Sequence, residues 1–362
     1  MNQWPSWLPL RQNLQELSAY GAPQLPADAV MNTNENPYPP SAALAKAIAD
    51  RISEVAPTLN RYPDRDALVL RDKLADFING LSRTKFGSAN VWAANGSNEI
   101  IQSLFMAFGG GTALGFTPSY SMHPLIAKVT QVQWLNGNRR EDFTLDIDSA
   151  IEQIQRDKPT LTFITTPNNP TGSAVTIEEI EKIAKSTSGL LIVDEAYAEF
   201  SDEISAVTLI EKYPHVVVIR TMSKAFAFAG VRLGYLVADP AVVDAMFLVR
   251  LPYHLSALTQ AAGEVALDFK DELLGTVAQL RTDRDRVAAQ LSQMGLSVIP
   301  SASNFLLFSG FKMPSAQLWQ AMLDRGVLIR DVGLLGYLRV TIGNEAENTK
   351  FISTLSLCLG EK

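Results

Sequence analysis

The chain has 362 residues, of which 47% are hydrophobic and 19% charged, and its formal net charge is −7 at pH 7. This balance is typical of a globular protein with one large and one smaller domain, and it excludes a disordered or fibrous chain. A negative charge without a cluster of lysines and arginines argues against nucleic acid or a membrane surface as partner, because both attract positive patches. We therefore expect a small-molecule ligand.

The cysteine count and the first residues bear on location. Cys358 is the single cysteine, so it cannot form an intrachain disulfide, which fits a reducing compartment. The opening stretch, MNQWPSWLPLRQNLQ, lacks the basic segment and apolar run of a signal peptide, and no apolar run has the length of a membrane span. We expect a cytoplasmic protein.

The first forty residues are rich in proline and asparagine, which predicts an irregular arm. Ser41 is placed to cap the helix that follows. In that helix the apolar residues recur at helical spacing, at Leu44, Ile48 and Ile52.

Between about residues 90 and 240, short apolar runs alternate with amphipathic helices, one of which begins at a capping box formed by Thr176 and Glu179. The runs are VWAA (91–94), ALGF (113–116), LTFIT (161–165), LLIV (190–193) and HVVVI (215–219). Continuous apolar strands separated by helices predict an α/β domain with a mostly parallel sheet covered by helices on both faces.

After Pro252 the pattern changes to that of a smaller α+β domain. A long helix is expected at about 271–294, then strands in SVIP and NFLLF, a helix around AQLWQAMLD, and strands in GVLIRD and YLRVTIG. We predict three parts: an N-terminal arm that joins the small domain (1–45), a large cofactor-binding domain (46–255) and a small C-terminal domain (256–362).

Polar residues follow five of the predicted strands. Because ligands of open parallel sheets bind beyond the carboxyl ends of the strands, these residues converge on one edge of one sheet. They are Asn95, Gly96, Ser97, Asn98, Tyr120, Asn168, Asn169, Asp194, Tyr197, Thr221, Ser223 and Lys224. This convergence predicts a binding site more strongly than any single motif does.

The loop NGSNEII, at 95–101, runs directly into a helix. Its free backbone N–H groups and the positive end of the helix dipole would bind phosphate. Taken alone, the loop is better explained as an ordinary N-cap, since serine and asparagine are preferred there. It gains weight from the other residues at the same edge.

Nucleotide and metal sites find little support. LLIVDE resembles the strand that carries a magnesium-binding aspartate in ATP-binding proteins, but the Gly-rich stretch GGGTALGF (109–116) lacks the lysine of a phosphate loop and the spacing of a dinucleotide fingerprint. The histidines His123, His215 and His254 are scattered, so we expect no metal and structural roles for them. A phosphate-bearing cofactor other than ATP or NAD remains.

Lys224 indicates which cofactor this is. A lysine at a covered strand end loses hydration, which lowers its pKa and makes the neutral amine available to bond to an aldehyde. Pyridoxal 5′-phosphate is an aldehyde cofactor that also needs a carboxylate at its pyridine nitrogen and donors for its phosphate. Asp194 would meet the first need, and Arg232, with Thr221, Ser223 and the 95–98 loop, the second.

Several motifs resemble those of known enzymes. PNNPTG, VDEAY and TMSKAFAFAGVRLG resemble fold-type I pyridoxal-phosphate aminotransferases, which have an aspartate-aminotransferase-like fold. Within them, NENPYPP, NRYPD, AANGSNE, PSYSMHP and LIRDVG are similar to the histidinol-phosphate aminotransferase family. The likeness extends from about residue 20 to residue 343, with the motifs in the same order.

The resemblance implies roles for individual residues. Lys224 would bond to the cofactor, with Asp194 and Tyr197 as the other catalytic residues. Cofactor contacts would come from Gly96, Ser97, Asn98, Tyr120, Asn169, Asp194, Tyr197, Thr221, Ser223, Lys224 and Arg232. The family is homodimeric, and Tyr62 of NRYPD would reach the cofactor phosphate of the partner subunit. Substrate would be bound by Arg330, Arg339, Tyr20 and Asn169.

The implied reaction is the reversible transfer of an amino group from L-histidinol phosphate to 2-oxoglutarate, giving imidazole-acetol phosphate and L-glutamate in histidine biosynthesis. Arg330 and Arg339 suit these substrates because a guanidinium pairs with either carboxylate or phosphate. An aromatic amino-acid aminotransferase of the same fold is the alternative, and a decarboxylase using Lys224 is a weaker one. A non-enzymatic or ATP-dependent nucleotide-binding protein is the remote one.

Overall fold

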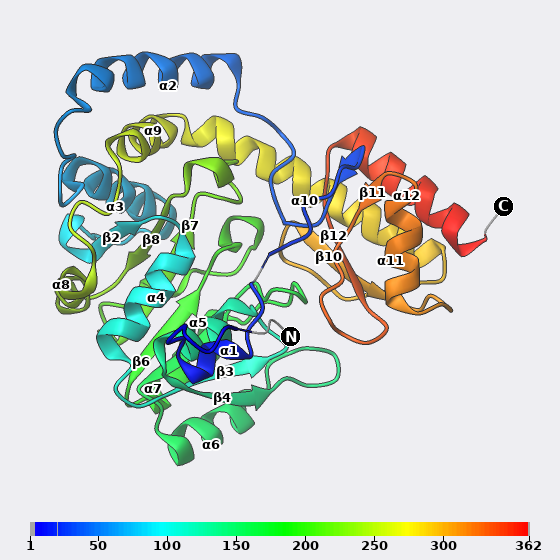
Figure 1. Cartoon of the computed structure of the whole chain (residues 1–362), viewed down its shortest axis with the longest axis horizontal. Helices are drawn as coiled ribbons and strands as arrows, with labels where there is room; N and C mark the ends of the chain where they lie inside the picture. Colours follow the sequence, from blue (N-terminus) through cyan, green and yellow to red (C-terminus); the bar gives the residue numbers. More distant parts are fainter. Residues whose placement is uncertain (1–3, 20, 361–362) are drawn as a thin grey trace.

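The computed structural model describes residues 4–19 and 21–360, and its large lobe is built on a seven-stranded sheet (Figure 1). The strand order is β2-β8-β7-β6-β5-β3-β4. The bounds are β2 (Val91–Ala94), β3 (Thr112–Thr117), β4 (Gln133–Asn138), β5 (Leu161–Thr165), β6 (Leu190–Asp194), β7 (Val216–Thr221) and β8 (Gly234–Val237). Strands β7, β6, β5, β3 and β4 pair in parallel, and β8 runs antiparallel to both β7 and β2. The predicted mostly parallel sheet is confirmed.

Helices cover both faces of this sheet, as predicted. Alternate residues of the buried strands enter two separate hydrophobic cores, one on each face. The helices over one face are α4 (Ser97–Phe108), α5 (Met122–Thr130) and α8 (Pro240–Val249), and those over the other are α3 (Leu68–Ser82), α6 (Ile147–Asp157) and α7 (Ile177–Ser186). Short 3₁₀ helices lie at Ala56–Thr58, Ser88–Asn90, Ala198–Phe200, Ala206–Leu209 and Ala229–Val231.

Two predicted helix starts are confirmed by their caps. Helix α2 (Ala42–Val55) begins after Ser41, whose hydroxyl accepts a hydrogen bond from the backbone N–H of Leu44 at 3.1 Å. Helix α7 begins with the expected capping box, in which Thr176 and Glu179 each accept from the other's backbone N–H.

The sequence pattern did not predict two strands of the sheet, β4 and β8. Strand β4, QWLNGN, lies at the edge of the sheet, where one side is open and polar residues are tolerated. Strand β8, GYLV, is only four residues long and follows the loop that carries Arg232. Its antiparallel insertion between β2 and β7 depends on tertiary pairing that no local pattern encodes.

The small lobe contains the helices and strands expected after Pro252. Its three-stranded antiparallel sheet has the order β12-β10-β9, with β12 (Leu338–Thr341), β10 (Phe305–Ser309) and β9 (Ser297–Val298). Its helices are α10 (Lys270–Gln293), α11 (Ser315–Leu323) and α12 (Glu345–Leu359). Helix α10 runs from the large lobe into the small one (Figure 1).

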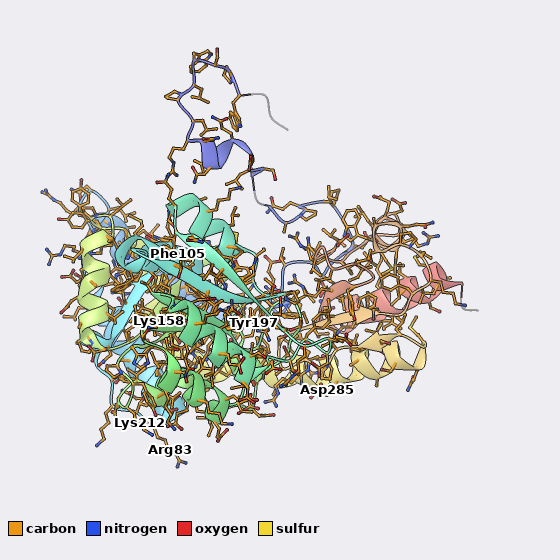
Figure 2. The ribbon with its side chains drawn as sticks, turned by 90° about the horizontal axis from the view of Figure 1, so that it is seen from below. Arg83, Phe105, Lys158, Tyr197, Lys212 and Asp285 are labelled. Atoms are coloured by element: carbon orange, nitrogen blue, oxygen red, sulfur yellow. The ribbon has the colours of Figure 1, made fainter. Side chains whose placement is uncertain are left out.

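The N-terminal arm contacts both lobes. Strand β1 (Ala29–Val30) pairs in parallel with β11 (Val327–Leu328) of the small lobe. Nearer the start of the chain, α1 (Gln12–Gln15) projects beside the large lobe (Figure 2), where the side chain of Asn13 donates to the carbonyl of Lys128 in α5. Helix α9 (Ala257–Asp268) packs on α2 and α3 of the large lobe. The exact division into domains stays a prediction.

One further property of the helices concerns membranes. In the part of the chain that the structure describes, none of them combines the length and apolar character needed to cross a bilayer.

Candidate active site

A cavity of about 420 Å³ lies at the carboxyl edge of the large sheet, where the small lobe and the arm meet it. Twelve of the residues expected at the site line it: Ser97, Asn98, Tyr120, Asn169, Asp194, Tyr197, Thr221, Ser223, Lys224, Arg232, Arg330 and Arg339. Gly96 and Tyr62 do not line it, although Gly96 lies next to Arg232, which does. Tyr20 lies outside the described residues.

One end of the cavity suits a phosphate group. Gly96 is the N-cap of α4 and has φ 86°, so the first N–H groups of the helix follow a residue with no side chain. Its φ of 86° with ψ of 169° is a backbone conformation that glycine adopts freely and other residues rarely do, and a Cβ at this position would also push Nη2 of Arg232 away, since it would lie 2.8 Å from it. The guanidinium and the helix N-terminus together attract an anion. The hydroxyls of Thr221 and Ser223 line the same cavity.

Lys224 faces the cavity from the loop after β7. Its Nζ donates to the backbone carbonyl of Thr33 in the arm at 2.9 Å. Removal from water, together with repulsion from Arg339 and Arg232, lowers the pKa of Lys224 to about 8, against an opposing attraction to Glu35. A much larger fraction of this amine is therefore neutral near pH 7 than of an ordinary lysine.

Asp194, the last residue of β6, is buried and held by two contacts. Its Oδ1 accepts from the backbone N–H of Ala196 at 3.2 Å, and its Oδ2 lies 3.1 Å from Nε2 of His123. His123 is itself buried and packs against the rings of Tyr120 and Phe163. The sequence interpretation of His123 as a purely structural residue missed this contact. The only signal for it was its place in PSYSMHP.

Two tyrosines, Tyr120 and Tyr197, also line the cavity. The hydroxyl of Tyr120 donates to Oδ1 of Asn98 at 3.1 Å. Tyr197 lies toward the small lobe (Figure 2), and its ring meets that of Phe305 edge to face at 5.2 Å. The amide of Asn169 approaches the Tyr197 hydroxyl at 3.4 Å.

Two arginines form the small-lobe wall. Arg339 lies in β12, Arg330 follows β11, and their backbones exchange two hydrogen bonds of 2.9 Å. Arg339 is buried, donates to Oδ1 of Asn169 at 2.5 Å and to the carbonyl of Asn32 at 2.9 Å, and lies over the ring of Phe305. Two arginines of the small lobe thus line the same cavity as the helix N-terminus of the large lobe.

The arm contributes residues that the sequence interpretation missed. Asn32, Thr33 and Asn34 line the cavity. The sequence interpretation used the motif NENPYPP, which begins at Asn34, but it assigned none of these three residues to the site. Two of them act through backbone carbonyls, which accept from Lys224 and Arg339. Every residue has a backbone carbonyl, so residue types in the sequence do not reveal such contacts.

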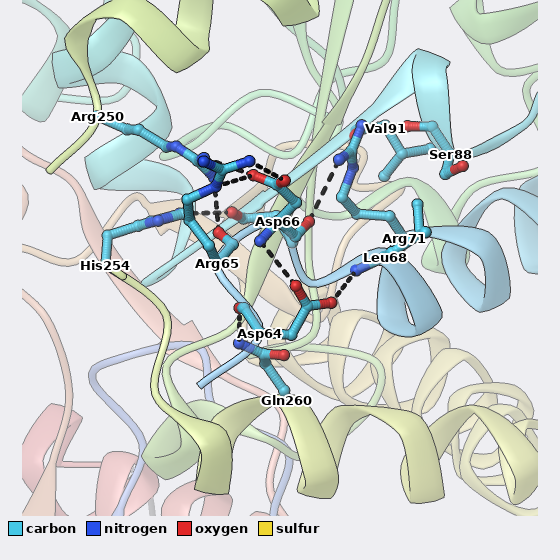
Figure 3. A network of polar contacts seen from close by, with 11 residues as sticks. Asp64, Arg65, Asp66, Leu68, Arg71, Ser88, Val91, Arg250, His254 and Gln260 are labelled. Carbon is cyan, nitrogen blue, oxygen red and sulfur yellow. Dashed lines mark hydrogen bonds and ion pairs between the residues drawn. The ribbon is translucent and has the colours of Figure 1, made fainter. Parts of the chain in front are cut away.

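Tyr62 lies apart from this cavity on the surface. It is 78% exposed and stacks on Tyr253 at 4.3 Å between ring centroids. Hydrogen bonds hold the loop after it: Arg250 donates to Asp66 at 2.6 Å, and Asp64 accepts from two backbone N–H groups (Figure 3). Hydrogen bonds from Arg65 and Arg250 lower the pKa of Asp66 to about 2, so Asp66 is ionised near pH 7 and keeps its ion pair with Arg250.

The other two histidines serve the fold. His254 lies near the same loop (Figure 3), with its Nε2 2.9 Å from the carbonyl of Ala93 and its ring stacked on Trp92. Nε2 of His215 lies 2.9 Å from the carbonyl of Ala184. Neither lines the cavity.

The residues present fit pyridoxal 5′-phosphate. An amine of lowered pKa faces the cavity, a buried carboxylate lies in its wall, and a helix N-terminus with an arginine closes one end. On a mostly parallel sheet with a second, smaller lobe, this arrangement is that of a fold-type I aminotransferase. A family model for aminotransferase class I and II matches residues 29–355, so the chain belongs to this family.

Two relatives are similar to this chain over nearly its whole length. The chain is 56% identical over 348 residues, 95% of each chain, to the histidinol-phosphate aminotransferase of Corynebacterium glutamicum strain R. It is 55% identical over 350 residues to that of Mycolicibacterium smegmatis, covering 96% of this chain and 92% of the relative.

Solved structures agree on the fold. A histidinol-phosphate aminotransferase from Sinorhizobium meliloti, in complex with pyridoxal 5′-phosphate, superposes with a TM-score of 0.85 at 22% identity, over 97% of this chain and 98% of that one. The enzyme of the same name from Clostridium acetobutylicum gives 0.80 at 25% identity, over 91% and 98%.

Proposed function

We propose that this aminotransferase moves an amino group between L-histidinol phosphate and 2-oxoglutarate, giving imidazole-acetol phosphate and L-glutamate in histidine biosynthesis. The observation that carries the proposal is the 56% identity over 95% of the chain to an enzyme of that name. The geometry supports it, because Arg330 and Arg339 of the small lobe line the cavity and provide two cationic groups for substrate anions, in addition to Arg232 at the phosphate cradle.

Pyridoxal 5′-phosphate, when bound, supplies an aldehyde and a ring that withdraws electrons from the substrate. Lys224 would hold the aldehyde carbon through Nζ, and Asp194 would hold a proton on the ring nitrogen, steadied by His123. Ser97, Asn98 and the residues around Arg232 would bind the phosphate. This assignment is supported by the way the structure gathers these groups around one cavity.

The remaining groups of the large lobe would orient the ring. Tyr120 would pack over its face, and Asn169 and Tyr197 would hydrogen-bond its phenolic oxygen. All three line the same cavity as Lys224. The ring plane would thereby be held in one orientation relative to Nζ of Lys224.

Lys224 would also move the proton that the reaction transfers. Once the substrate amine had displaced it, Nζ would be a free amine within the cavity, able to accept a proton from the substrate Cα and to return it to the cofactor carbon on the other side of the substrate nitrogen. A pKa of about 8 suits both steps near neutral pH. No other lysine lines the cavity among the described residues.

Arg330 and Arg339 would bind the substrate phosphate or carboxylate. A guanidinium can pair bidentately with either anion, which a single site for two different substrates requires. Asn169 would be released from Arg339 in part when an anion binds, since the two side chains are hydrogen-bonded in its absence. Tyr20 is kept as a further substrate contact by resemblance only.

We also propose a homodimer in which Tyr62 reaches the cofactor phosphate of the partner subunit. This is supported by the exposure of Tyr62 and by the hydrogen bond from Arg250 to Asp66 that holds the loop after it. A protein that is monomeric in light scattering and fully active would contradict it.

The division into an arm (1–45), a large domain (46–255) and a small domain (256–362) is also part of this proposal. A cytoplasmic location fits the single cysteine.

The test is a substrate comparison on the purified protein. We expect L-glutamate to form from 2-oxoglutarate with L-histidinol phosphate as donor, at a kcat/KM well above that with L-phenylalanine. A preference for L-phenylalanine would make the chain an aromatic amino-acid aminotransferase. Release of CO₂ would indicate a decarboxylase, and tight ATP binding without cofactor absorbance a nucleotide-binding protein.

A further inference from the structure

Phe143 stands at a turn position where local rules favour glycine. The turn lies in the loop after β4, where the backbone N–H of Phe143 donates to the carbonyl of Arg140, and that of Arg140 to the carbonyl of Thr144, both at 2.9 Å. The φ of Phe143 is 66°, in the left-handed region that bulky residues rarely adopt. The third residue of a three-residue hairpin loop is typically a glycine in this conformation. An aromatic ring there suggests a tertiary role.

The backbone of Phe143 is held in this conformation by two donors. Its carbonyl accepts from Nη1 of Arg139 at 3.3 Å and from Oγ of Ser173, in the loop after β5, at 3.2 Å. Arg139 also donates through Nε to the carbonyl of Phe116 in β3 at 3.3 Å. The turn is therefore tied to the large sheet, and the ring extends from a fixed point.

The ring of Phe143 contacts the small lobe. It packs edge to face on Tyr337, with 5.3 Å between the ring centroids and 76° between the ring planes. Figure 1 shows the loop after β4 extending from the sheet toward the small lobe. Aromatic pairs in this arrangement attract each other beyond the area that they bury, so the contact contributes to holding the two lobes together.

Tyr337 belongs to the segment that carries both arginines of the small-lobe wall. Arg330 and Arg339 pair through their backbones at the base of a hairpin, which we call the arginine hairpin (residues 330–339). Its first three residues, 330–332, line the cavity. Any movement of this hairpin therefore moves the cavity wall.

The outer part of the arginine hairpin projects into solvent. Leu335, near its tip, is 99% exposed. Among the described residues, the hydrogen bonds of 331–337 run within this segment, such as that from the N–H of Tyr337 to the carbonyl of Leu334 at 3.0 Å. The ring contact with Phe143 thus connects the outer part of the hairpin to the large lobe.

We propose that Phe143 is a positioning residue for substrate binding, which holds the arginine hairpin against the large lobe by packing on Tyr337. This rests on the substrate role proposed above for Arg330 and Arg339. A hairpin released from Phe143 populates other positions, and the apparent affinity for an anionic substrate falls by the fraction of molecules that are out of place. An edge-to-face pair shifts such an equilibrium by about two- to tenfold, which bounds the effect.

The experiment is a single-turnover reaction of the holoenzyme with L-glutamate, followed through the visible absorption of the cofactor. It yields an apparent Kd and a rate at saturation separately. We expect Phe143→Gly to raise the apparent Kd by about 3–10-fold and to leave the saturating rate unchanged, because bound substrate itself holds the arginines in place. Folding should be retained, since glycine suits the positive φ.

The partner ring gives an independent test. Tyr337→Ala should raise the apparent Kd as Phe143→Gly does, and Tyr337→Phe, which keeps the ring, should restore the affinity of the unaltered enzyme. The double variant Phe143→Gly with Tyr337→Ala should bind L-glutamate no more weakly than either single variant, because both changes remove the same contact.

Glu141→Gly is the matched control. Glu141 is exposed in the same turn, so this variant introduces a glycine there while the ring of Phe143 stays in place. Its apparent Kd and its saturating rate should both equal those of the unaltered enzyme.

Three outcomes would overturn the proposal: an unchanged apparent Kd in Phe143→Gly, a loss confined to the saturating rate, or losses in the two single variants that add up in the double variant. Because L-glutamate is the donor, none of these outcomes depends on histidinol phosphate. If the histidinol phosphate proposal fails, the unaltered enzyme would instead react with L-glutamate without turning over L-histidinol phosphate.

Discussion

The two halves of the site differ in how they are built. The large-lobe half consists of side chains at the carboxyl ends of buried parallel strands, among them Asp194 and Lys224. The small-lobe half consists of Arg339 in β12 and Arg330 just after β11, together with backbone carbonyls of the arm. We infer that the first half performs the chemistry on a rigid frame, and that the second recognises substrates on a part that is tied to the arm.

The largest expected effect comes from Lys224→Ala. Removing the amine that bonds to the cofactor and moves the proton should lower kcat by about 10⁴-fold or more. Glutamate formation measures the loss of turnover, and the visible absorption band measures the loss of the bond to the cofactor. Lys46→Ala, at an exposed lysine of α2, is the control and should behave as the unaltered enzyme. Substantial turnover by Lys224→Ala would refute the proposed division of labour.

Asp194→Asn should be nearly as severe. The amide cannot hold a proton on the ring nitrogen by charge, so we expect kcat to fall by about 10²–10³-fold while some cofactor is retained. Asp239→Asn, at the N-cap of α8, is a suitable control because it changes the same chemistry far from the cavity. If KM rather than kcat bore the loss in Asp194→Asn, the large lobe would be a recognition surface after all.

The small-lobe half is tested by Arg339→Lys. Lysine keeps the charge but not the two-pronged geometry with which two nitrogens of Arg339 reach Asn169 and Asn32 separately. We expect kcat/KM to fall by about 10–100-fold, mainly through KM. Arg325→Lys, on the surface of the same lobe, should have no such effect. A loss confined to kcat would remove the distinction between the two halves.

The smallest effect concerns stability. The pKa of Lys224 falls from 10.5 to about 8 on folding, so between these values the unfolded chain binds more protons and stability rises with pH. Lys224→Met should therefore raise the unfolding free energy of the apoprotein by about 1–3 kcal/mol at pH 7. The gain should shrink toward pH 10.5 and be absent in Lys46→Met. Denaturant titrations at several pH values measure it. An equal gain at all pH values would contradict the lowered pKa.

The sequence predicted the large-lobe half because its signals are local. Each strand is a continuous apolar run, and the polar residue after it needs only the rule that carboxyl ends of parallel strands share an edge. Asp194, Asn169 and Lys224 could thus be assigned to one site from their positions in the sequence. Their chemical types then indicated the cofactor.

The contacts of His123 and Thr33 could not be predicted in this way. His123 meets Asp194 across 71 residues of sequence, and Thr33 meets Lys224 across 191. Apolar spacing carries no information about such pairs. For Thr33 the contact is made by a carbonyl that every residue possesses.

The sequence by itself therefore determined the class of fold, the cofactor, and the side chains at the strand ends, because these depend on periodicity and residue chemistry. Only the tertiary structure decided how the carbonyls of Thr33 and Asn32 in the arm reach Lys224 and Arg339, and which partner holds Asp194. Those features depend on distances between segments far apart in the chain, which the folded packing alone sets.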